Sequence, residues 1–391
     1  MGAGRALCEL MIDWRIIVVL IVLVFGCLIL MSVVGFQRDD MADDDHQGPA
    51  AARPVFGNAG PGHAHARAGR EKRGSAAPPW RGGSRSRKKD RVKLLPADAT
   101  VTFADERQEA GIDEVFAALD NDLVGLVPVK TKVQEIAALL LVDRARQKFG
   151  LDAPRPNLHM CFTGPPGTGK TTVALRMAEL LHRLEFLEEG QLVHAMRNDL
   201  VGEYIGQTAP KTRRVLDKAM GGVLFIDEAY YLWRTGDSLD YGQEAIDILL
   251  QVMENEREKL VVILAGYKDR MDEFFTSNPG MRSRIAHHLD FASYDLDELT
   301  AIGRLMLDRS RYYLSEAAEA TLRGYLTGQM DEPMFANARS VRNELERARL
   351  RHAHRLASDL HRRWTRDDLM RLEPEDILTE GAGQPLQHNR L

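Results

Sequence analysis

A glycine-rich segment between two apolar stretches constrains this chain more than any other feature. The apolar run at residues 158–162 predicts a buried strand, and apolar residues at helical spacing begin at Val173. Between them the sequence reads Gly164, Pro165, Pro166, Gly167, Thr168, Gly169, Lys170, Thr171 and Thr172. A strand, the pattern G-x-x-x-x-G-K-T and a helix in this order predict a phosphate-binding loop.

The residue types of this loop suit the binding of phosphate. Glycines let backbone amides turn toward phosphate oxygens because they carry no Cβ, and the helix that follows directs its positive end to the same place. We expect Lys170 to reach the β- and γ-phosphates and the Thr171 hydroxyl to ligate Mg²⁺. A chance glycine-rich turn rarely has both flanking elements, so the sequence predicts a site for a nucleoside triphosphate.

Composition indicates a folded protein with more than one domain. The chain has 391 residues, of which 44% are hydrophobic, and this is enough for two or three domains with apolar cores. The formal net charge of -5 predicts no overall attraction to nucleic acid. The cysteines Cys8, Cys27 and Cys161 are widely separated and form no C-x-x-C pair, which favours a reduced, cytosolic setting for the folded part.

The first 98 residues differ from the rest of the chain. Residues 16–35 form an uncharged apolar run long enough to span a bilayer, so residues 1–36 are a candidate membrane anchor with the nucleotide-binding part on the cytosolic side. Alternatively, translation starts at Met41 and the apolar run is never made. Residues 37–98 are rich in Gly, Ala, Pro, Arg and His, which predicts a disordered, solvated linker. Binding of anionic lipid or RNA by its basic part, residues 81–93, is the less favoured alternative.

Apolar patterns beyond residue 98 predict two folded domains. Strands alternating with helices over residues 99–293 indicate a doubly wound α/β domain with a parallel sheet. Strand signals end near residue 293, and residues 294–380 predict a small all-helical domain before a tail at 381–391. The expected helices lie at residues 112–119, 129–149, 295–312, 316–327 and 339–363, and the expected strands at 158–162, 191–194, 223–226 and 260–265.

Two acidic residues end one of the predicted strands. Asp227 and Glu228 directly follow the apolar run at residues 223–226. At the carboxyl edge of a parallel sheet, beside a phosphate-binding loop, Asp227 is placed to hold Mg²⁺ through water. Glu228 is then placed to orient and polarise an attacking water, because phosphoryl transfer depends mostly on positioning. Such a pair can also cap a helix, but its place downstream of the loop favours the catalytic interpretation.

The loop and the acidic strand end together resemble the AAA+ ATPases, whose members commonly form hexameric rings. The resemblance implies that Val124 and Gly125, in the segment D-L-V-G-L, contact adenine. The segment N-P-G-M-R-S-R at residues 278–284 resembles the element that presents an arginine to the neighbouring subunit. Arg284 is the favoured arginine finger and Arg282 the alternative. If neither arginine acts in a neighbouring subunit, a surface salt bridge or a phosphate contact within one subunit would explain the pair.

Two further positions are compared with the sensors of that family. Arg339 follows A-N-A at the start of a predicted helix and resembles the second sensor, which reaches the γ-phosphate. At the first sensor the family usually has Asn or Thr, whereas this chain reads A-G-Y-K at residues 265–268. The first sensor is therefore left unassigned.

A glycine-containing loop narrows the resemblance. Tyr204, Ile205 and Gly206 form an aromatic–aliphatic–glycine step where AAA+ motors carry the loop that lines the ring's pore. An aromatic ring grips an extended chain without sequence preference, and glycine lets the loop move; a turn with a half-buried tyrosine is the alternative. Together with the motifs above, this loop is similar to the CbbX/CfxQ group, the red-type Rubisco activases, over residues 101–378.

This resemblance implies a homo-hexameric ATPase that uses ATP and Mg²⁺ to pull on the C-terminal tail of the red-type Rubisco large subunit. The pull would release a tightly bound sugar phosphate, with ribulose 1,5-bisphosphate as an allosteric ligand whose site is not placed. It implies no specific nucleic-acid partner. Alternatives are a motor of the same group acting in type VII secretion or sporulation, and a nucleotide-binding scaffold without turnover. The intact residues Lys170, Asp227 and Glu228 argue against the scaffold.

Overall fold

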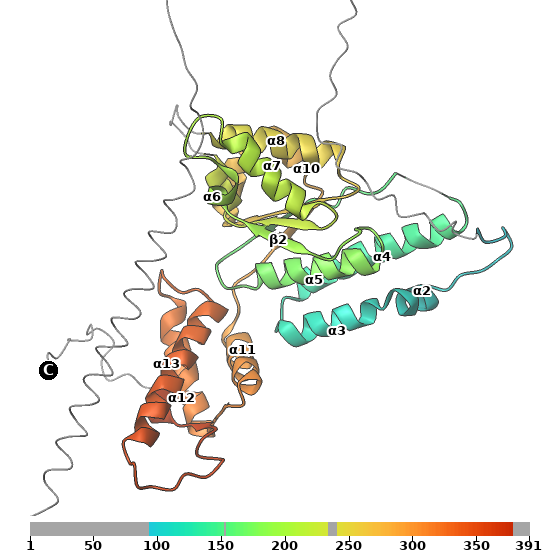
Figure 1. Ribbon diagram of the computed structural model, residues 1–391. Helices are drawn as coiled ribbons and strands as arrows, with labels where there is room; N and C mark the ends of the chain where they lie inside the picture. The colour runs from blue at the N-terminus through green and yellow to red at the C-terminus, as the bar shows by residue number, and fades with distance from the viewer. Residues whose placement is uncertain (1–93, 152–153, 234–240, 378–391) are drawn as a thin grey trace, which may run out of the picture. The chain divides into compact units, whose positions relative to one another are not determined.

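The computed structural model describes residues 94–151, 154–233 and 241–377 (Figure 1). The candidate anchor at residues 16–35, residues 37–93 of the linker and the tail at 381–391 lie outside the described residues. None of the helices formed by the described residues has the length and apolarity needed to cross a bilayer.

A parallel sheet forms the centre of the α/β domain. The described residues form a five-stranded sheet in the order β2-β3-β4-β1-β5, and every neighbouring pair is parallel. The strands are β1 (Met160–Thr163), β2 (Leu192–Ala195), β3 (Val223–Ile226), β4 (Val261–Gly266) and β5 (His287–Asp290). Because β1 lies between β4 and β5, the phosphate-binding loop leaves the sheet from an interior strand, next to the end of β4.

Burial explains which strands the sequence predicts. Every residue of β1, β3 and β4 is buried, as expected where helices cover both faces of a parallel sheet. The predictions for these strands and for β2 are confirmed, with shifts of a residue or two at the ends. β5 was not predicted, because Leu289 is its buried residue and the others are partly or fully exposed.

Successive residues along the strands belong alternately to two apolar clusters. Phe162, Phe225 and Ile263 lie in one cluster with apolar side chains of α3, α4 and α5. Their neighbours Leu224 and Leu264 lie in the other, with side chains of α7, α8 and α9. This alternation follows from the two-residue period of a strand. The helices are α2 (Phe103–Ala110), α3 (Ile112–Asp122), α4 (Val127–Lys148), α5 (Lys170–Arg183), α6 (Arg197–Leu200), α7 (Thr208–Ala219), η1 (Ala229–Leu232), α8 (Gly242–Asn255), α9 (Lys268–Ser277) and α10 (Pro279–Arg284).

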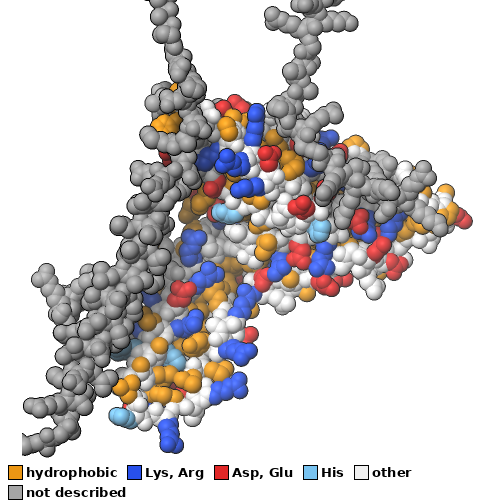
Figure 2. All heavy atoms as spheres, viewed as in Figure 1, with side chains coloured by type: hydrophobic (Ala, Val, Ile, Leu, Met, Phe, Trp, Pro, Cys, Tyr) orange, Lys and Arg blue, Asp and Glu red, His pale blue; other side chains and the backbone are white. Residues whose placement is uncertain are grey.

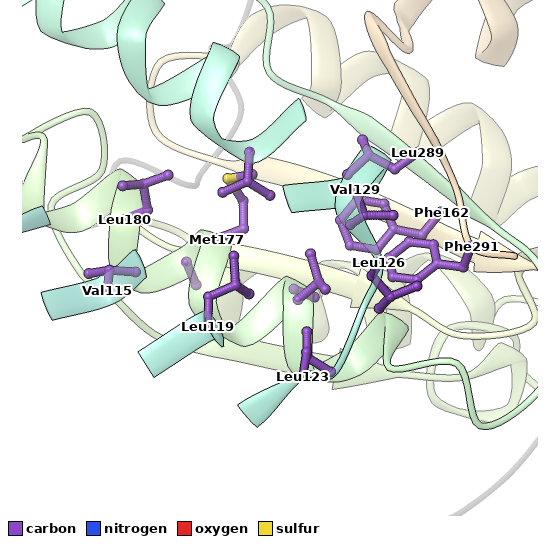
Figure 3. Packing of buried hydrophobic residues seen from close by; sticks show 14 of the residues in the cluster. Val115, Leu119, Leu123, Leu126, Val129, Phe162, Met177, Leu180, Leu289 and Phe291 are labelled. Atoms are coloured by element: carbon purple, nitrogen blue, oxygen red, sulfur yellow. The ribbon is translucent and has the colours of Figure 1, made fainter. Parts of the chain in front are cut away.

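The amphipathic helix α3 packs against the helix that follows the phosphate-binding loop. Val115 and Leu119, on one face of α3, lie beside Met177 and Leu180 of α5 (Figure 3). Apolar residues three and four positions apart share one side of a helix, so the periodicity that predicted α3 also identifies its packing face.

Helix α2 is held by charge rather than by apolar packing, and it was not predicted. Its Glu106 is buried against the ammonium of Lys148 at 2.5 Å and the guanidinium of Arg144 at 3.3 Å, both on α4. Glu109 pairs with Lys148 at 2.7 Å. Acidic and basic side chains are interspersed along this end of the molecule (Figure 2). An eight-residue segment with so few apolar residues shows no helical periodicity.

The C-terminal part is helical, as expected, with a small addition. Its helices are α11 (Leu296–Arg309), α12 (Glu316–Met330), α13 (Ala338–Ala357) and α14 (Pro374–Ile377). A short parallel pair, β6 (Tyr313–Leu314) and β7 (Arg371–Leu372), was not expected in this part. Two residues per strand are too few to show a strand pattern. α13 also ends at Ala357, before the expected limit of residue 363.

Candidate active site

A cavity of about 480 Å³ opens at the carboxyl end of β1 and β3. Its walls come from the end of α3, the phosphate-binding loop, the ends of β3 and β4, and the helices that follow the sheet. The lining residues are Asp122, Leu123, Val124, Pro166, Gly167, Thr168, Gly169, Lys170, Thr171, Thr172, Asp227, Glu228, Tyr267, Tyr294, Ile302, Leu305, Met306, Arg309, Ala338, Arg339 and Arg342. The cavity thus combines a polar phosphate end with apolar walls that suit a nucleotide base.

Backbone geometry explains two glycines of the loop. Gly167 and Gly169 adopt left-handed φ values of 72° and 95°, which residues with a Cβ rarely adopt. A Cβ at Gly167 would also stand 2.1 Å from the carbonyl oxygen of Ala336. Because Gly169 precedes α5 without a side chain, the first amide groups of that helix are left for an anionic ligand.

Lys170 is half-buried at the base of the loop. Its Nζ donates hydrogen bonds to the carbonyl oxygens of Gly164, at 2.8 Å, and Pro165, at 2.7 Å. Burial lowers the pKa of Lys170, and the nearby carboxylates of Asp227 and Glu228 oppose that change. Among the described residues both hydrogen-bond partners of this ammonium are neutral carbonyls, so its charge is well suited to an incoming phosphate.

The two acids lie at the end of β3, as the sequence predicted, and face the same cavity. The amide of Asp227 donates to the carbonyl of Ala195 on β2 at 3.0 Å, and Asp227 Oδ1 accepts from the Glu228 amide at 3.1 Å. Glu228 has a left-handed φ of 50°. Burial raises the pKa of Glu228, and the carboxylate of Asp227 raises it further.

Magnesium fits the oxygen donors of this site. Among the described residues no cluster of three or more His, Cys, Asp or Glu side chains could hold a metal by itself. Thr171 and Asp227 both line the cavity and carry oxygen donors, and Mg²⁺ commonly takes a few protein oxygens and completes its shell with phosphate oxygens and water. The residues present therefore match a metal that arrives with a nucleotide.

The helical part contacts the phosphate-binding loop directly. The carbonyl oxygens of Pro166, Gly167 and Thr168 accept hydrogen bonds from Asn337 Nδ2 at 3.3 Å, the Ala338 amide at 3.2 Å and the Tyr294 hydroxyl at 3.1 Å, respectively. We call these contacts the loop–lid joint. Asn337 is 1% exposed, and its Oδ1 accepts from the Tyr294 amide at 3.0 Å. The joint therefore ties successive loop carbonyls to two segments of the helical part, the one just before α11 and the start of α13.

Several lining residues had no assigned role in the sequence predictions. Tyr267 follows β4, where the family usually places its first sensor, and its side chain lines the cavity. Arg309 pairs with Asp122 at 2.8 Å, and Asp122 also pairs with Arg176 of α5. These residues come from separate elements, so no local spacing in the sequence identifies them. Arg339, predicted as second sensor, does line the cavity.

Val124 lines the cavity, whereas Gly125 lies against Glu298 of α11, which leaves no room for a side chain at this position. Gly125 has a left-handed φ of 60°, and a Cβ there would stand 1.8 Å from an oxygen of Glu298. Of the two residues predicted to contact adenine, Val124 is therefore the one that forms part of the cavity wall.

Comparison with known proteins identifies the family. The model of the "ATPase family associated with various cellular activities (AAA)" matches residues 160–293, and the AAA lid domain matches residues 295–385. "Protein CbxX, chromosomal" of Cupriavidus necator is 61% identical over 258 residues, which cover 66% of this chain and 81% of that protein. The chain belongs to the CbbX/CfxQ group of AAA+ ATPases.

Two further relatives of this AAA+ ATPase carry informative names. "Protein CbbX" of Cereibacter sphaeroides is 60% identical over 66% of this chain and 84% of that protein. "Ribulose bisphosphate carboxylase/oxygenase activase, chloroplastic" of Cyanidioschyzon merolae is 56% identical over 73% of this chain and 98% of that protein. Membership of the family establishes that the chain hydrolyses ATP, and it identifies the helical part as the AAA lid.

The residues predicted to act beyond one subunit lie away from the cavity of this AAA+ ATPase. Arg284, at the end of α10, is an ion-pair partner of Glu254 at 3.4 Å and donates to the Gly280 carbonyl at 3.0 Å, while Arg282 is exposed. Neither arginine lines the cavity. A role for either one in hydrolysis would thus require the cavity of another subunit.

The predicted pore loop is strongly exposed. Tyr204 is 68% exposed and Ile205 is 83% exposed. Gly206 has a φ of 82°, and a Cβ built on it would meet no atom within 4 Å among the described residues. Tyr204 is therefore not a half-buried core residue, and the alternative of a turn with a half-buried tyrosine is wrong. Both apolar side chains are available for contact with another molecule.

Proposed function

We propose that this AAA+ ATPase reactivates inhibited red-type Rubisco by pulling on the C-terminal tail of its large subunit and releasing a tightly bound sugar phosphate. The activase name of the Cyanidioschyzon merolae relative supports Rubisco as the client. The exposed pair Tyr204–Ile205 is the structural observation that supports pulling. Large apolar side chains held out on a loop can pack against an extended segment by contacts that do not depend on its sequence.

Hydrolysis within one subunit is assigned to residues that line the cavity. The loop amides and Lys170 bind the phosphates, and Arg339 approaches the γ-phosphate from the lid. Thr171 and Asp227 would hold Mg²⁺, which neutralises charge on the phosphates when it is bound. Glu228 orients the attacking water and polarises it.

Assembly into a homo-hexamer would complete the site. Arg284 lies outside the cavity of its own subunit, so we propose that it enters the neighbouring subunit's cavity as an arginine finger, with Arg282 as the alternative. An added cation stabilises the charge that develops on the transferred phosphoryl group. Its present partner Glu254 is an exposed carboxylate, and exchanging such a partner costs little.

Ribulose 1,5-bisphosphate is proposed as an allosteric ligand, and no residue is assigned to it. A client in type VII secretion or sporulation stays the alternative to Rubisco, since the motor residues do not depend on the client. We place the ATPase domain in the cytosol, where ATP is available. An anchor at residues 16–35 and a start at Met41 stay alternative predictions, because both concern residues outside the described ones.

Substitution of Tyr204 tests the proposed function. Tyr204→Ala is expected to keep assembly and most ATPase activity, because this residue does not line the nucleotide cavity. It should lose reactivation of red-type Rubisco inhibited with a bound sugar phosphate, measured as recovered carboxylation. Tyr204→Phe is the matched control and should retain most of the reactivation, since the aromatic face provides the grip.

The possible outcomes separate the motor from its client. Undiminished reactivation by a well-folded Tyr204→Ala protein would exclude threading through this loop. If the unmutated ATPase fails to reactivate any red-type Rubisco, the client assignment is wrong and the ATP-driven motor remains. Parallel loss of ATPase activity, reactivation and thermal stability in Tyr204→Ala would instead identify a structural tyrosine.

A further inference from the structure

A tyrosine that follows the proposed catalytic glutamate contacts it directly. Tyr230 lies in η1, and its hydroxyl donates a hydrogen bond to Oε2 of Glu228. The Tyr230 side chain is 7% exposed and belongs to the apolar cluster on the α8 and α9 side of the sheet. Its hydroxyl therefore reaches Glu228 from the core, while its ring stays inside the domain.

The ring of Tyr230 is confined on several sides. The guanidinium of Arg270, on α9, lies 5.1 Å from the Tyr230 ring centroid and 5.7 Å from that of Tyr267. A Cβ on Gly266, the last residue of β4, would stand 2.8 Å from Tyr230 Cδ1. Tyr231 packs beside it with ring centroids 4.6 Å apart. Such packing restricts the ring, so the hydroxyl is held in one place.

We propose that Tyr230 is the positioning residue for Glu228. The hydroxyl holds Oε2, so that Oε1 is the carboxylate oxygen that accepts a hydrogen bond from the attacking water. This inference rests on the catalytic role proposed for Glu228. A hydrogen bond to a charged acceptor is about twice as strong as one between neutral groups, so a single hydroxyl is sufficient to orient the carboxylate.

The geometry favours this role over a merely structural one. A buried tyrosine needs some partner for its hydroxyl, and a backbone carbonyl would satisfy that need. Here the hydroxyl donates instead to the Glu228 carboxylate, whose residue lines the cavity next to Asp227, and it accepts from Arg270 Nη1 at 3.4 Å. Glu228 itself adopts a left-handed φ of 50°, a conformation that is costly for a residue with a Cβ and that is concentrated at functional sites.

Replacement of Tyr230 by Phe removes the hydroxyl and keeps the ring. Tyr230→Phe should lower kcat for ATP hydrolysis about tenfold, within the range of one hydrogen bond to a charged group. ATP affinity, measured by titration calorimetry, should stay within about twofold, because Tyr230 does not line the cavity. Tyr231→Phe is the matched control: its hydroxyl lies 3.3 Å from Arg270 Nη1 and is not bonded to Glu228 among the described contacts. It should retain the full rate.

A double variant separates positioning from fold stability. In the Glu228→Gln background, Tyr230→Phe should lower the residual single-turnover rate by less than about twofold, because residues that act as a unit are not additive. A tenfold loss in both backgrounds would overturn the inference, as would an unchanged or increased kcat in Tyr230→Phe alone. A normal rate in Glu228→Gln would remove the catalytic role of Glu228 and this inference with it. A slow Glu228→Gln beside a normal Tyr230→Phe would overturn the inference alone.

Discussion

The two faces of the central sheet pack against different parts of the molecule. On one face, Phe162 and Phe225 pack with α3 and α5, and the same apolar cluster continues into the lid through Leu322 and Val341. On the other face, strand residues pack with α7, α8 and α9, and the neighbouring segments carry the exposed Tyr204 and Arg282 and the half-buried Arg284. The first face is continuous with the lid, whereas the second lies next to the groups that we propose to contact other molecules.

This difference indicates where nucleotide hydrolysis could be coupled to contact with other molecules. Asp227 and Glu228 stand at the end of β3, whose side chains alternate between the two clusters. The lid contacts the phosphate-binding loop from the first face, and Tyr230 contacts Glu228 from the second. The edge of the sheet is therefore the place where nucleotide chemistry can be coupled to contacts with a neighbour or a client.

Substitution of Glu228 or Lys170, at the carboxyl edge of the sheet, should have the largest effect on ATP hydrolysis or binding. Glu228→Gln is expected to bind ATP and to hydrolyse it at least ~100-fold more slowly, because the water is no longer polarised. Lys170→Ala should instead lose ATP binding, since the ammonium that would contact the phosphates is removed from the loop. Phosphate release and nucleotide titration on the same preparations measure both effects. Normal turnover by Glu228→Gln would show that the edge is not the catalytic centre.

An intermediate effect is expected on the exposed face. Arg284→Ala should bind ATP normally and turn over more than ~10-fold more slowly, because an arginine finger stabilises the transition state rather than the bound nucleotide. Mixing it with Glu228→Gln protein should restore part of the activity, since mixed interfaces pair an intact arginine with an intact glutamate.

Arg282→Ala is the matched comparison on the same short helix. Full ATPase activity of Arg284→Ala together with slow turnover by Arg282→Ala would identify Arg282 as the arginine finger. Full activity of both would show that this face does not contribute to hydrolysis, and the contrast between the two faces would fail.

A smaller effect, on the KM for ATP, is expected when Asn337 on the lid side is replaced. Asn337→Gly removes the side-chain hydrogen bonds of Asn337 to the Pro166 carbonyl and to the Tyr294 amide, and its φ of 49° and ψ of −127° are readily adopted by glycine. The KM for ATP should rise several-fold, in line with the loss of one or two neutral hydrogen bonds. Thr327→Ala, whose hydroxyl bonds a carbonyl of its own helix, is the control. An unchanged KM in Asn337→Gly would mean that the lid does not depend on this joint.

Burial decides how much of the fold could be predicted from sequence. The strands β1, β3 and β4 are apolar at every position and were predicted close to their observed bounds. β5 has two histidines and one buried leucine, and α2 is held by ion pairs to α4. Neither element has a local apolar pattern, because its partners are supplied by distant parts of the chain.

The candidate site divides in the same way. Lys170, Thr171, Asp227 and Glu228 belong to contiguous motifs, and the structure brings all of them to one cavity. The hydroxyl of Tyr294 instead contacts the Thr168 carbonyl across 126 positions of sequence. Such residues become recognisable only when the chain is folded, since no spacing relates them.

The loop–lid joint bears on how such a motor could diversify. The bond from the Ala338 amide to the Gly167 carbonyl joins two backbone groups, so side-chain replacements that preserve the local backbone leave its donor and acceptor in place. Tyr204 and Ile205, by contrast, hold their exposed side chains clear of the core, and replacements there cost little folding free energy. Sequence drift can therefore accumulate in the loop that we propose for client contact, while the backbone joint between the phosphate-binding loop and the lid stays unchanged.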